Sequence, residues 1–181
     1  IELAAAQVRV MTVAQIAARL DSALGLLTSK SHTGQARQLT LRTTLDWSYA
    51  LLTKAERVLL QRLSVFAGGW TLEAAEAICA DSPSTSILPQ LTALVDKSLI
   101  TLAGGRFRML EMVRQFATER LAASGEEPLL LARHQEYFVA LAEEAASRLS
   151  GAEQEETLHK METEYDNLRT ILRLSKQGIC S

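Results

Sequence analysis

The sequence predicts a mostly α-helical protein in which one small β-hairpin interrupts a succession of short helices. Three observations predict this fold class. Apolar residues recur at three- and four-residue spacing through most of the chain, which is the period of an amphipathic helix. Only 5% of the 181 residues are aromatic, while alanine and leucine, both strong helix formers, are abundant. One pair of short alternating runs, joined by Gly104-Gly105, has instead the pattern of two strands and a tight turn.

Composition divides the chain into three segments. Residues 1–39 contain short helical stretches and a polar run, residues 28–38, whose Ser, Thr, Gly and Gln content is typical of a linker. Residues 40–125 alternate helical runs with short turns and are expected to form one domain. Residues 126–181 carry the pattern of two long amphipathic helices with an acidic excess, and predict a helical hairpin.

Two helices open the middle segment. The first is predicted by apolar spacing, with one face made by Leu41, Leu45, Tyr49 and Leu52. The second begins after Thr53, because Glu56 follows three residues later and the two can form a capping box. Its predicted inward stripe consists of Ala55, Leu59, Leu63 and Phe66.

Two further helices follow a glycine pair. Thr71 is the expected N-cap of the third helix, whose inward residues are Leu72, Ala75, Ile78 and Cys79. The fourth helix covers residues 87–97 and can begin at Ser86, which places Pro89 in the first turn, where a missing N–H costs nothing. The inward face of the fourth helix is predicted to be Ile87, Leu88, Leu91, Leu94 and Val95.

A hairpin and a last helix complete this segment. Arg106 and Arg108 alternate with Phe107 and Met109, as in a half-buried strand. The helix that follows is expected to stop at Gly125. The order helix, helix, helix, hairpin, helix, with tight corners, is that of a winged helix-turn-helix.

The adjacent glycines Gly68 and Gly69 raise the question of a phosphate-binding loop. Such a loop follows a strand and ends in Gly-Lys-Ser/Thr, whereas Trp70 comes next here and no lysine is near. The preceding run has a helical period. We therefore interpret the pair as a corner between two helices, in which one glycine ends a helix in the left-handed conformation.

The stretch TLRTTLDWSYALLTKAERVLLQRLSVFAGGWTLEAAEAIC, residues 40–79, resembles the winged-helix segment of bacterial STAND regulatory ATPases. These NB-ARC-like signalling ATPases are attached to many transcriptional regulators. LVDKSLI, RFRMLEMVRQFATERL and EYDNLRTIL are similar to later landmarks of the family. Residues 1–20 resemble the helical subdomain that ends its nucleotide-binding module.

The resemblance implies an architecture and a role. An ATPase module would precede residue 1 and hold ATP or ADP, and a TPR-like sensor array would follow the winged helix. The chain itself would hold no cofactor and would be a regulatory, non-catalytic fragment. Its winged helix would act as an intramolecular clamp, a unit that holds neighbouring parts of the same chain together, and as an oligomerisation surface. Its first partner would be the upstream nucleotide-binding module.

The resemblance also locates a nucleotide sensor. Many family members carry Met-His-Asp at the end of the winged helix, where the histidine senses bound ADP. The matching positions are Met109, Leu110 and Glu111. Leucine cannot donate a hydrogen bond to phosphate, so the sensing role does not carry over to Leu110.

The alternative is a winged-helix transcription factor that contacts DNA directly. Its candidate residues are Gln90, Lys97, Arg106 and Arg108. On the fourth helix, however, Lys97 is the only basic residue, and it stands beside Asp96. Residues 40–125 contain nine basic and eight acidic residues. A DNA-binding domain normally has a strongly basic face. We therefore do not expect direct DNA contact.

Other chemistries have no supporting constellation. His32, His134 and His159 stand in different segments without metal spacing, and are predicted to be surface residues. Cys79 and Cys180 match no disulfide or metal pattern, which favours a reducing, cytoplasmic compartment. The carboxylate pairs at 143–144 and 155–156 lie on highly charged helices and are expected to be solvated. We predict neither an enzyme, a metal site nor a membrane protein.

The last segment predicts an apolar seam on its final helix, made by Leu158, Met161, Tyr165, Leu168 and Leu172. The partner helix is expected to offer His134, Tyr137, Phe138, Leu141, Ala145 and Leu149. A helical repeat buries its open face against the next repeat. We therefore expect residues 128–176 to be able to self-associate, with the winged helix outside the contact.

Overall fold

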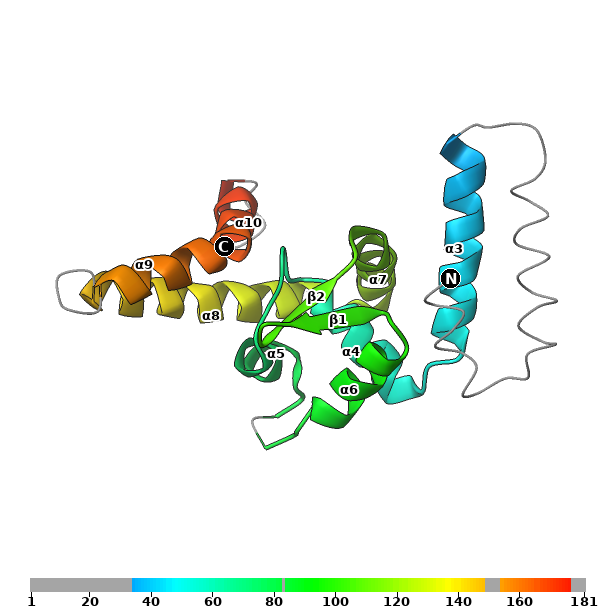
Figure 1. Cartoon of the computed structure of the whole chain (residues 1–181), viewed down its shortest axis with the longest axis horizontal. Helices are drawn as coiled ribbons and strands as arrows, with labels where there is room; N and C mark the ends of the chain where they lie inside the picture. Colours follow the sequence, from blue (N-terminus) through cyan, green and yellow to red (C-terminus); the bar gives the residue numbers. More distant parts are fainter. Residues whose placement is uncertain (1–33, 83, 149–153, 177–181) are drawn as a thin grey trace.

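The computed structural model describes residues 34–82, 84–148 and 154–176, and the side chains of residues 42–82, 84–148 and 154–173. In chain order the elements are α3 (Gly34–Ala50), α4 (Lys54–Leu63), α5 (Leu72–Cys79), α6 (Leu88–Asp96), β1 (Ile100–Ala103), β2 (Arg106–Met109), α7 (Glu111–Ser124), α8 (Glu127–Arg148), α9 (Gln154–Thr163) and α10 (Tyr165–Lys176). The fold class predicted from the sequence is confirmed. Helices α4 to α7 and the hairpin lie between α3 on one side and α9 with α10 on the other (Figure 1).

Side-chain caps and glycine turns delimit the elements of the middle segment as predicted. The Thr53 hydroxyl accepts the Glu56 N–H, and the Glu56 carboxylate accepts the Thr53 N–H at 2.7 Å, which completes the capping box of α4. Thr71 caps α5 by accepting the Ala74 N–H at 3.3 Å. The strands β1 and β2 pair antiparallel across Gly104 and Gly105, whose φ angles of +57° and +75° suit a two-residue turn.

One core joins the middle segment to the C-terminal helices. Phe66 stacks on Trp70 with ring centroids 5.2 Å apart, and Trp70 stacks in turn on Phe107 of β2. Phe138 of α8 meets Phe66 edge-on, and Ile171 of α10 is buried in the same cluster. The winged helix, α8 and α10 therefore pack around a shared interior rather than around separate cores.

Some residues predicted to be buried, and one predicted helix start, differ from the structure by one helical turn or less. Ala55 is exposed, because the buried face of α4 runs through Glu56, Leu59, Leu60 and Leu63. Phe66 is buried but lies in the turn after α4 rather than on it. Helix α6 begins at Leu88 instead of Ser86, and Leu88 is 46% exposed rather than inward. The other inward residues predicted for α5 and α6 are buried or half-buried.

The linker predicted for residues 28–38 is wrong in its second half, because α3 already begins at Gly34. The side chain of Leu41 lies outside the described residues. Farther along α3, Leu45 is buried and Tyr49 packs edge-on against Phe116 of α7, with ring centroids 5.5 Å apart. Helix α3 thus docks on the winged helix through the face that its apolar spacing predicted.

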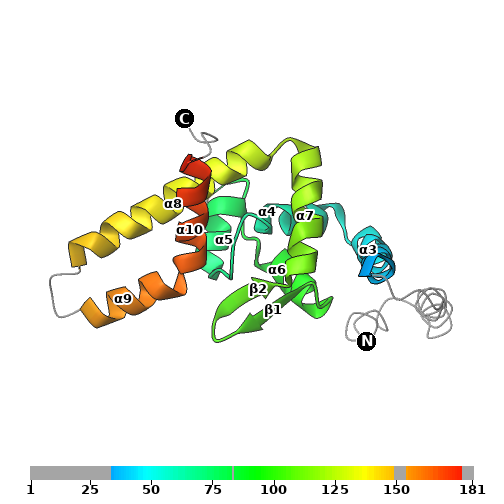
Figure 2. The same ribbon diagram turned by 90° about the horizontal axis from the view of Figure 1, so that it is seen from above.

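The seam predicted on the last helix is wrong in part: Met161 and Leu168 are half-buried, and Leu168 packs against the core, but the other three residues are exposed. Residues 154–176 form two helices that change direction at Glu164, α9 and α10, instead of one (Figure 2). Leu158, Tyr165 and Leu172 are 47%, 60% and 66% exposed, and the buried residues are Thr157, Glu164, Asn167 and Ile171. The buried face is rotated because Glu164 and Asn167 have polar partners in the winged helix, which apolar periodicity cannot reveal. On α8, Phe138 and Ala145 are buried as expected, Tyr137 and Leu141 are half-buried, and Leu149 lies outside the described residues.

Replacement of Phe66 by alanine should destabilise the protein. Phe66 is 1% exposed and touches the ring of Phe138 on α8 and that of Trp70, two residues before α5. Removal of a buried phenyl ring costs about 3–5 kcal/mol. Urea unfolding of Phe66→Ala and of the matched variant Leu102→Ala, whose side chain is 52% exposed, measures the difference. An unchanged unfolding midpoint in Phe66→Ala would contradict the packing described here.

Candidate nucleic-acid interface

Helix α6 holds the position of the recognition helix, because it is the last helix before the wing. Its outward face carries Leu88, Pro89, Thr92 and Asp96, all exposed. None of these four residues is basic, and the Thr92 hydroxyl donates back to the Leu88 carbonyl at 2.9 Å. Gln90 is only half-exposed, and its Oε1 is buried without a hydrogen bond among the described residues. The face offers no positive charge to a phosphate.

Lys97, the base predicted at the end of this helix, is bound within the chain. Its ammonium contacts both Glu56 carboxylate oxygens at 2.6 and 2.7 Å, and its side chain is 20% exposed. Burial alone would raise the pKa of the Glu56 carboxyl, but the hydrogen bonds from Lys97 and from the Thr53 N–H bring that pKa below its ordinary value. Glu56 therefore caps α4 and holds the end of α6 at once.

The two wing arginines have different surroundings. Arg106 donates to both oxygens of Glu164, from Nη1 at 2.5 Å and from Nη2 at 3.1 Å. The side chains of this pair are 17% and 7% exposed. Arg108 is exposed, and no ion pair of its side chain is found in the described part of the chain. Of the four candidate DNA contacts, Arg108 alone presents an open charge.

The glycine corner, Ala67-Gly68-Gly69, receives α10. Asn167 accepts the Ala67 N–H at 2.8 Å and donates to the Gly69 carbonyl at 2.9 Å and to Glu164 at 2.9 Å. Gly68 has φ +80°, and a Cβ at this residue would lie 2.6 Å from Oδ2 of Asp166. The left-handed glycine is confirmed, but it stands five residues beyond the end of α4 and so does not cap that helix. It is the point at which α10 approaches the winged helix.

Gly69 permits a second close approach. A Cβ there would lie 2.9 Å from the Phe107 carbonyl oxygen and 3.1 Å from Cγ of Arg108. Next to it, Trp70 and Phe107 exchange backbone hydrogen bonds of 3.0 and 2.8 Å. The corner is therefore fastened to the wing on one side and to α10 on the other.

His134 was predicted to be a surface residue, and this is wrong. It is fully buried on α8 between Phe66 and Phe138. Its Nε2 lies 3.5 Å from Oδ1 of Asn167, and its Nδ1 has no partner among the described residues. Burial lowers the pKa of His134 to about 4, despite the opposing effects of Asn167 and Glu164. His134 is a neutral core residue. His159 is exposed, and His32 lies outside the described residues.

The positions that match the nucleotide-sensor motif lie at the junction of β2 and α7. Met109 is half-buried, whereas Leu110 is 64% exposed. Glu111 pairs with Arg114 at 2.7 Å, and the hydrogen bonds from Arg114 hold the pKa of this carboxyl below its ordinary value. Leu110 thus presents an apolar side chain to solvent, with a paired carboxylate beside it.

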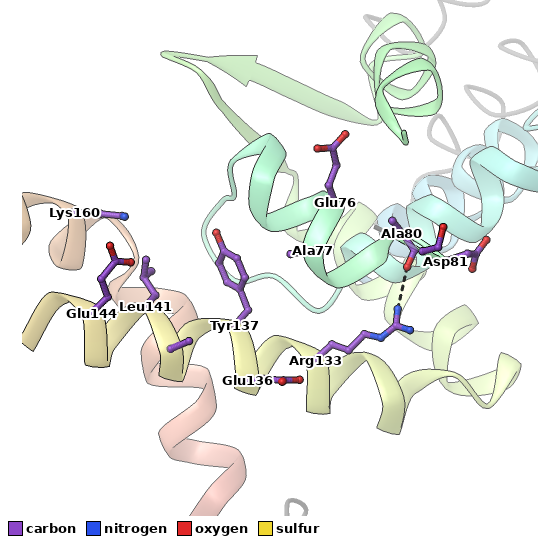
Figure 3. Close-up of a pocket in the computed structure, with 12 residues that line it drawn as sticks. Glu76, Ala77, Ala80, Asp81, Arg133, Glu136, Tyr137, Leu141, Glu144 and Lys160 are labelled. Atoms are coloured by element: carbon purple, nitrogen blue, oxygen red, sulfur yellow. Dashed lines mark hydrogen bonds between the residues drawn. The ribbon is translucent and has the colours of Figure 1, made fainter. Parts of the chain in front are cut away.

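A groove of about 800 Å³ separates α5 from α8 (Figure 3). The Tyr137 ring points into it from α8, and Lys160 of α9 lies at one end. At the other end, Arg133 donates to the Ala80 carbonyl at 3.0 Å and so satisfies a carbonyl that follows α5. The lining residues include no histidine or cysteine. The groove is a surface depression between two packed helices.

Residues 52–122 match the family described as the winged helix-turn-helix domain. The middle of the chain is a winged helix-turn-helix domain. Over 98% of its length, the chain is 42% identical to proteins of Mycobacterium tuberculosis and Mycobacterium bovis named "Putative HTH-type transcriptional regulator", and it covers 21% of each.

A second set of relatives is less similar. An "Uncharacterized protein" of Mycobacterium tuberculosis is 38% identical over 145 residues, which are 76% of this chain and 37% of that protein. No solved structure shows a significant match. The chain therefore spans about a fifth of the length of the regulators that it matches. It is homologous to part of these bacterial proteins, and its similarity to them extends beyond the winged helix-turn-helix domain on both sides.

In residues 34–82, 84–148 and 154–176, no group of three or more His, Cys, Asp or Glu residues is placed to hold a metal ion. No helix within these ranges is long and apolar enough to cross a lipid bilayer.

The residues that position the winged helix-turn-helix domain against α10 are those that sequence reasoning missed. The helical spacing of the last segment assigned no role to Glu164 or Asn167, and it was only as a capping residue that Glu56 was predicted. One signal was available: Glu164 and Asn167 are three residues apart and so share a helix face, on which Ile171 follows four residues later. In the structure this mixed face docks with its polar residues against the backbone of the corner and the wing, and with Ile171 in the core.

Gly68→Ala should destabilise the protein more than Gly105→Ala. Both glycines have positive φ, but a Cβ at Gly105 meets nothing within 4 Å. The Gly105 variant therefore reports only the left-handed backbone cost, about 1–2 kcal/mol. In the Gly68 variant the Asp166 carboxylate must also turn aside and its Cβ would lie 3.1 Å away, and we expect about 1 kcal/mol more for this crowding. Urea unfolding measures both variants, and Asp166→Ala should reduce the excess in Gly68→Ala. Equal losses in the two variants would show that α10 does not rest on Gly68.

The burial of His134 predicts a pH dependence. Because the folded-state pKa is about 4 and the ordinary value is 6.5, the unfolded chain takes up the proton first as the pH falls. The contribution of His134 is complete above pH 6.5 and is lost between there and about pH 4. Its size is about 3 kcal/mol at 1.36 kcal/mol per pKa unit.

The measurement is the free energy of unfolding of the wild type and of His134→Leu between pH 7 and pH 4. The loss over this window should be smaller in the variant, whereas His159→Gln, at an exposed position, should follow the wild type. Parallel curves for the wild type and His134→Leu would refute the assignment of His134 as a neutral core residue.

Proposed function

We propose that the chain is a regulatory, non-catalytic part of a STAND (NB-ARC-like) signal-transduction ATPase linked to bacterial transcriptional regulation. The resemblance of residues 40–79 to that family supports this, and so does homology to proteins named as HTH-type transcriptional regulators. ATP or ADP would bind to a module upstream, the first partner of this chain. Residues from α8 onward would begin a TPR-like sensor. The protein would work in the cytoplasm.

Within that protein the winged helix acts as an intramolecular clamp. The observation that carries this proposal is that basic side chains of the domain form ion pairs within the chain. Lys97 pairs with Glu56, and Arg106 pairs with Glu164 of the C-terminal helices. The same domain receives α3 on another side, where Arg120 of α7 pairs with Asp46 at 2.7 Å. A domain that pairs Arg106 and Arg120 with acidic residues of the helices on either side of it is suited to hold those helices in place.

The alternative is direct DNA contact. It is favoured by the position of α6 before the wing, by the name of the relatives and by exposed Arg108. The outward face of α6 argues against it, because this face has one acidic side chain, Asp96, and no basic one. Affinity for duplex DNA comes mainly from neutralised phosphates.

A mobility-shift assay separates the two functions. We expect no complex with promoter DNA at physiological salt that survives competitor DNA, because the recognition position offers no cation to the phosphates. The assay uses the wild type, Arg108→Ala and Thr92→Ala. A sequence-specific complex that Arg108→Ala abolishes would replace the clamp with the DNA-reading alternative.

Self-association through residues 128–176 is the second expected property of this part of the protein. Exposed Leu158, Tyr165 and Leu172 support it, although they lie on two helices rather than on one seam. Light scattering at increasing concentration should show dimers or larger species, and Tyr165→Lys with Leu172→Lys should restore the monomer. The control is Leu102→Lys at the wing tip, which should leave the association unchanged. A wild type that is monomeric at every concentration would remove this proposal.

A further inference from the structure

The Arg106–Glu164 pair joins the wing to a helix that is not part of the winged helix-turn-helix domain. Arg106 opens β2, and Glu164 lies 58 positions later, at the junction of α9 and α10. Both guanidinium nitrogens that face Glu164 are engaged, and the pair is largely shielded from water. An arginine at the base of a wing turn is thus neutralised by a carboxylate from elsewhere in the chain.

The surroundings of this pair form a donor-rich surface, the wing–corner face, which consists of Ala67, Gly68, Gly69, Arg106 and Arg108. Arg106 and Arg108 are two positions apart in β2 and so project from the same side of the hairpin. The side chain of Arg108 passes beside Gly69. The Ala67 N–H points toward α10, where it meets Asn167.

Helix α10 covers this face with acidic and amide groups. Glu164 forms an ion pair with Arg106, and Asn167 accepts a hydrogen bond from the Ala67 N–H. Asp166 lies beside Gly68. Carboxylate and phosphate oxygens bind a guanidinium in the same forked geometry. Two guanidiniums and a backbone N–H beside a glycine corner therefore remain for an anion if α10 moves away.

We propose that α10 is an internal cover over an anion-binding face of the wing, and that the ligand it excludes is the phosphate backbone of duplex DNA. The face belongs to a winged helix-turn-helix domain, and the relatives of the chain are named as HTH-type transcriptional regulators. The outward face of α6 has no basic side chain to hold it in the DNA groove, so the uncovered wing binds through phosphates alone. Its binding is therefore independent of sequence and strongly salt-dependent. The covered state does not bind. The inference goes beyond the clamp, since it concerns what the wing does once α10 has left it.

The test compares the full chain with Glu164→Gln, which removes the charge that holds Arg106 and preserves the side-chain size. Fluorescence anisotropy with a fluorescein-labelled 30-base-pair duplex at about 50 mM salt measures affinity. Amide hydrogen exchange at Ala67 measures whether α10 has left. We expect faster exchange at Ala67 and an affinity at least about tenfold higher than that of the wild type, with a steeper loss on adding salt.

Three controls sharpen the experiment. Glu162→Gln removes an equal charge from an exposed position on α9 and should change the affinity by less than about twofold, since its carboxylate is screened by solvent. Arg106→Gln in the Glu164→Gln background should abolish the gain. If Glu164→Gln leaves Ala67 protected, the double variant Glu164→Gln with Asn167→Ala removes the remaining side-chain bonds to the corner.

Two outcomes would overturn the proposal. Fast exchange at Ala67 without a gain in DNA affinity would mean that the exposed face does not bind duplex DNA, and labelled polyglutamate in the same assay would then show whether it takes an acidic protein segment instead. Continued protection of Ala67 in the double variant would mean that α10 is a fixed part of the fold and not a cover.

Discussion

The side chain of Asn167 decides how the two halves of the molecule meet. Between α4 and α5 the backbone turns through Ala67, Gly68 and Gly69, and its N–H and carbonyl groups there face another element instead of solvent. Buried backbone groups need partners, because an unpaired donor or acceptor costs as much as a lost hydrogen bond. Asn167 supplies a donor and an acceptor from one amide, and it also binds Glu164, which in turn binds the wing. The place of α10 on the winged helix-turn-helix domain follows from this amide.

Local chemistry made the elements of the winged helix predictable. The Thr53–Glu56 capping box, the Thr71 cap and the turn at Gly104-Gly105 are each encoded within four residues, and each is found where the sequence indicates. Helix starts were less certain where no side chain caps the first turn. Helix α6 has no side-chain cap and begins two residues later than expected, at Leu88.

The candidate interface could not be predicted in the same way, because its character depends on contacts between distant residues. Lys97 and Glu56 are 41 positions apart, and Arg106 and Glu164 are 58 apart. Composition had shown that the domain is nearly neutral, which anticipated a weak DNA surface. Composition could not show which basic side chains form ion pairs within the chain, or that His134 is enclosed between two phenyl rings. The seam prediction was wrong in part for the same reason. The face that carries Glu164 and Asn167 is buried because its hydrogen-bond partners, Arg106 and the corner backbone, lie opposite it.

Buried polar contacts of this kind specify a position more than they add stability. The attraction within a shielded ion pair is largely offset by the cost of removing both charges from water, whereas loss of one partner leaves a charge stranded. Packing of Phe138 and Ile171 in the shared core provides the apolar part of the contact, which many orientations of a helix could satisfy. The Arg106–Glu164 pair and the Asn167 amide are satisfied in one orientation only, with Gly68 free of a side chain. The polar part of this contact sets the orientation of α10 and adds little to the free energy needed to move it, and this property suits a regulatory joint.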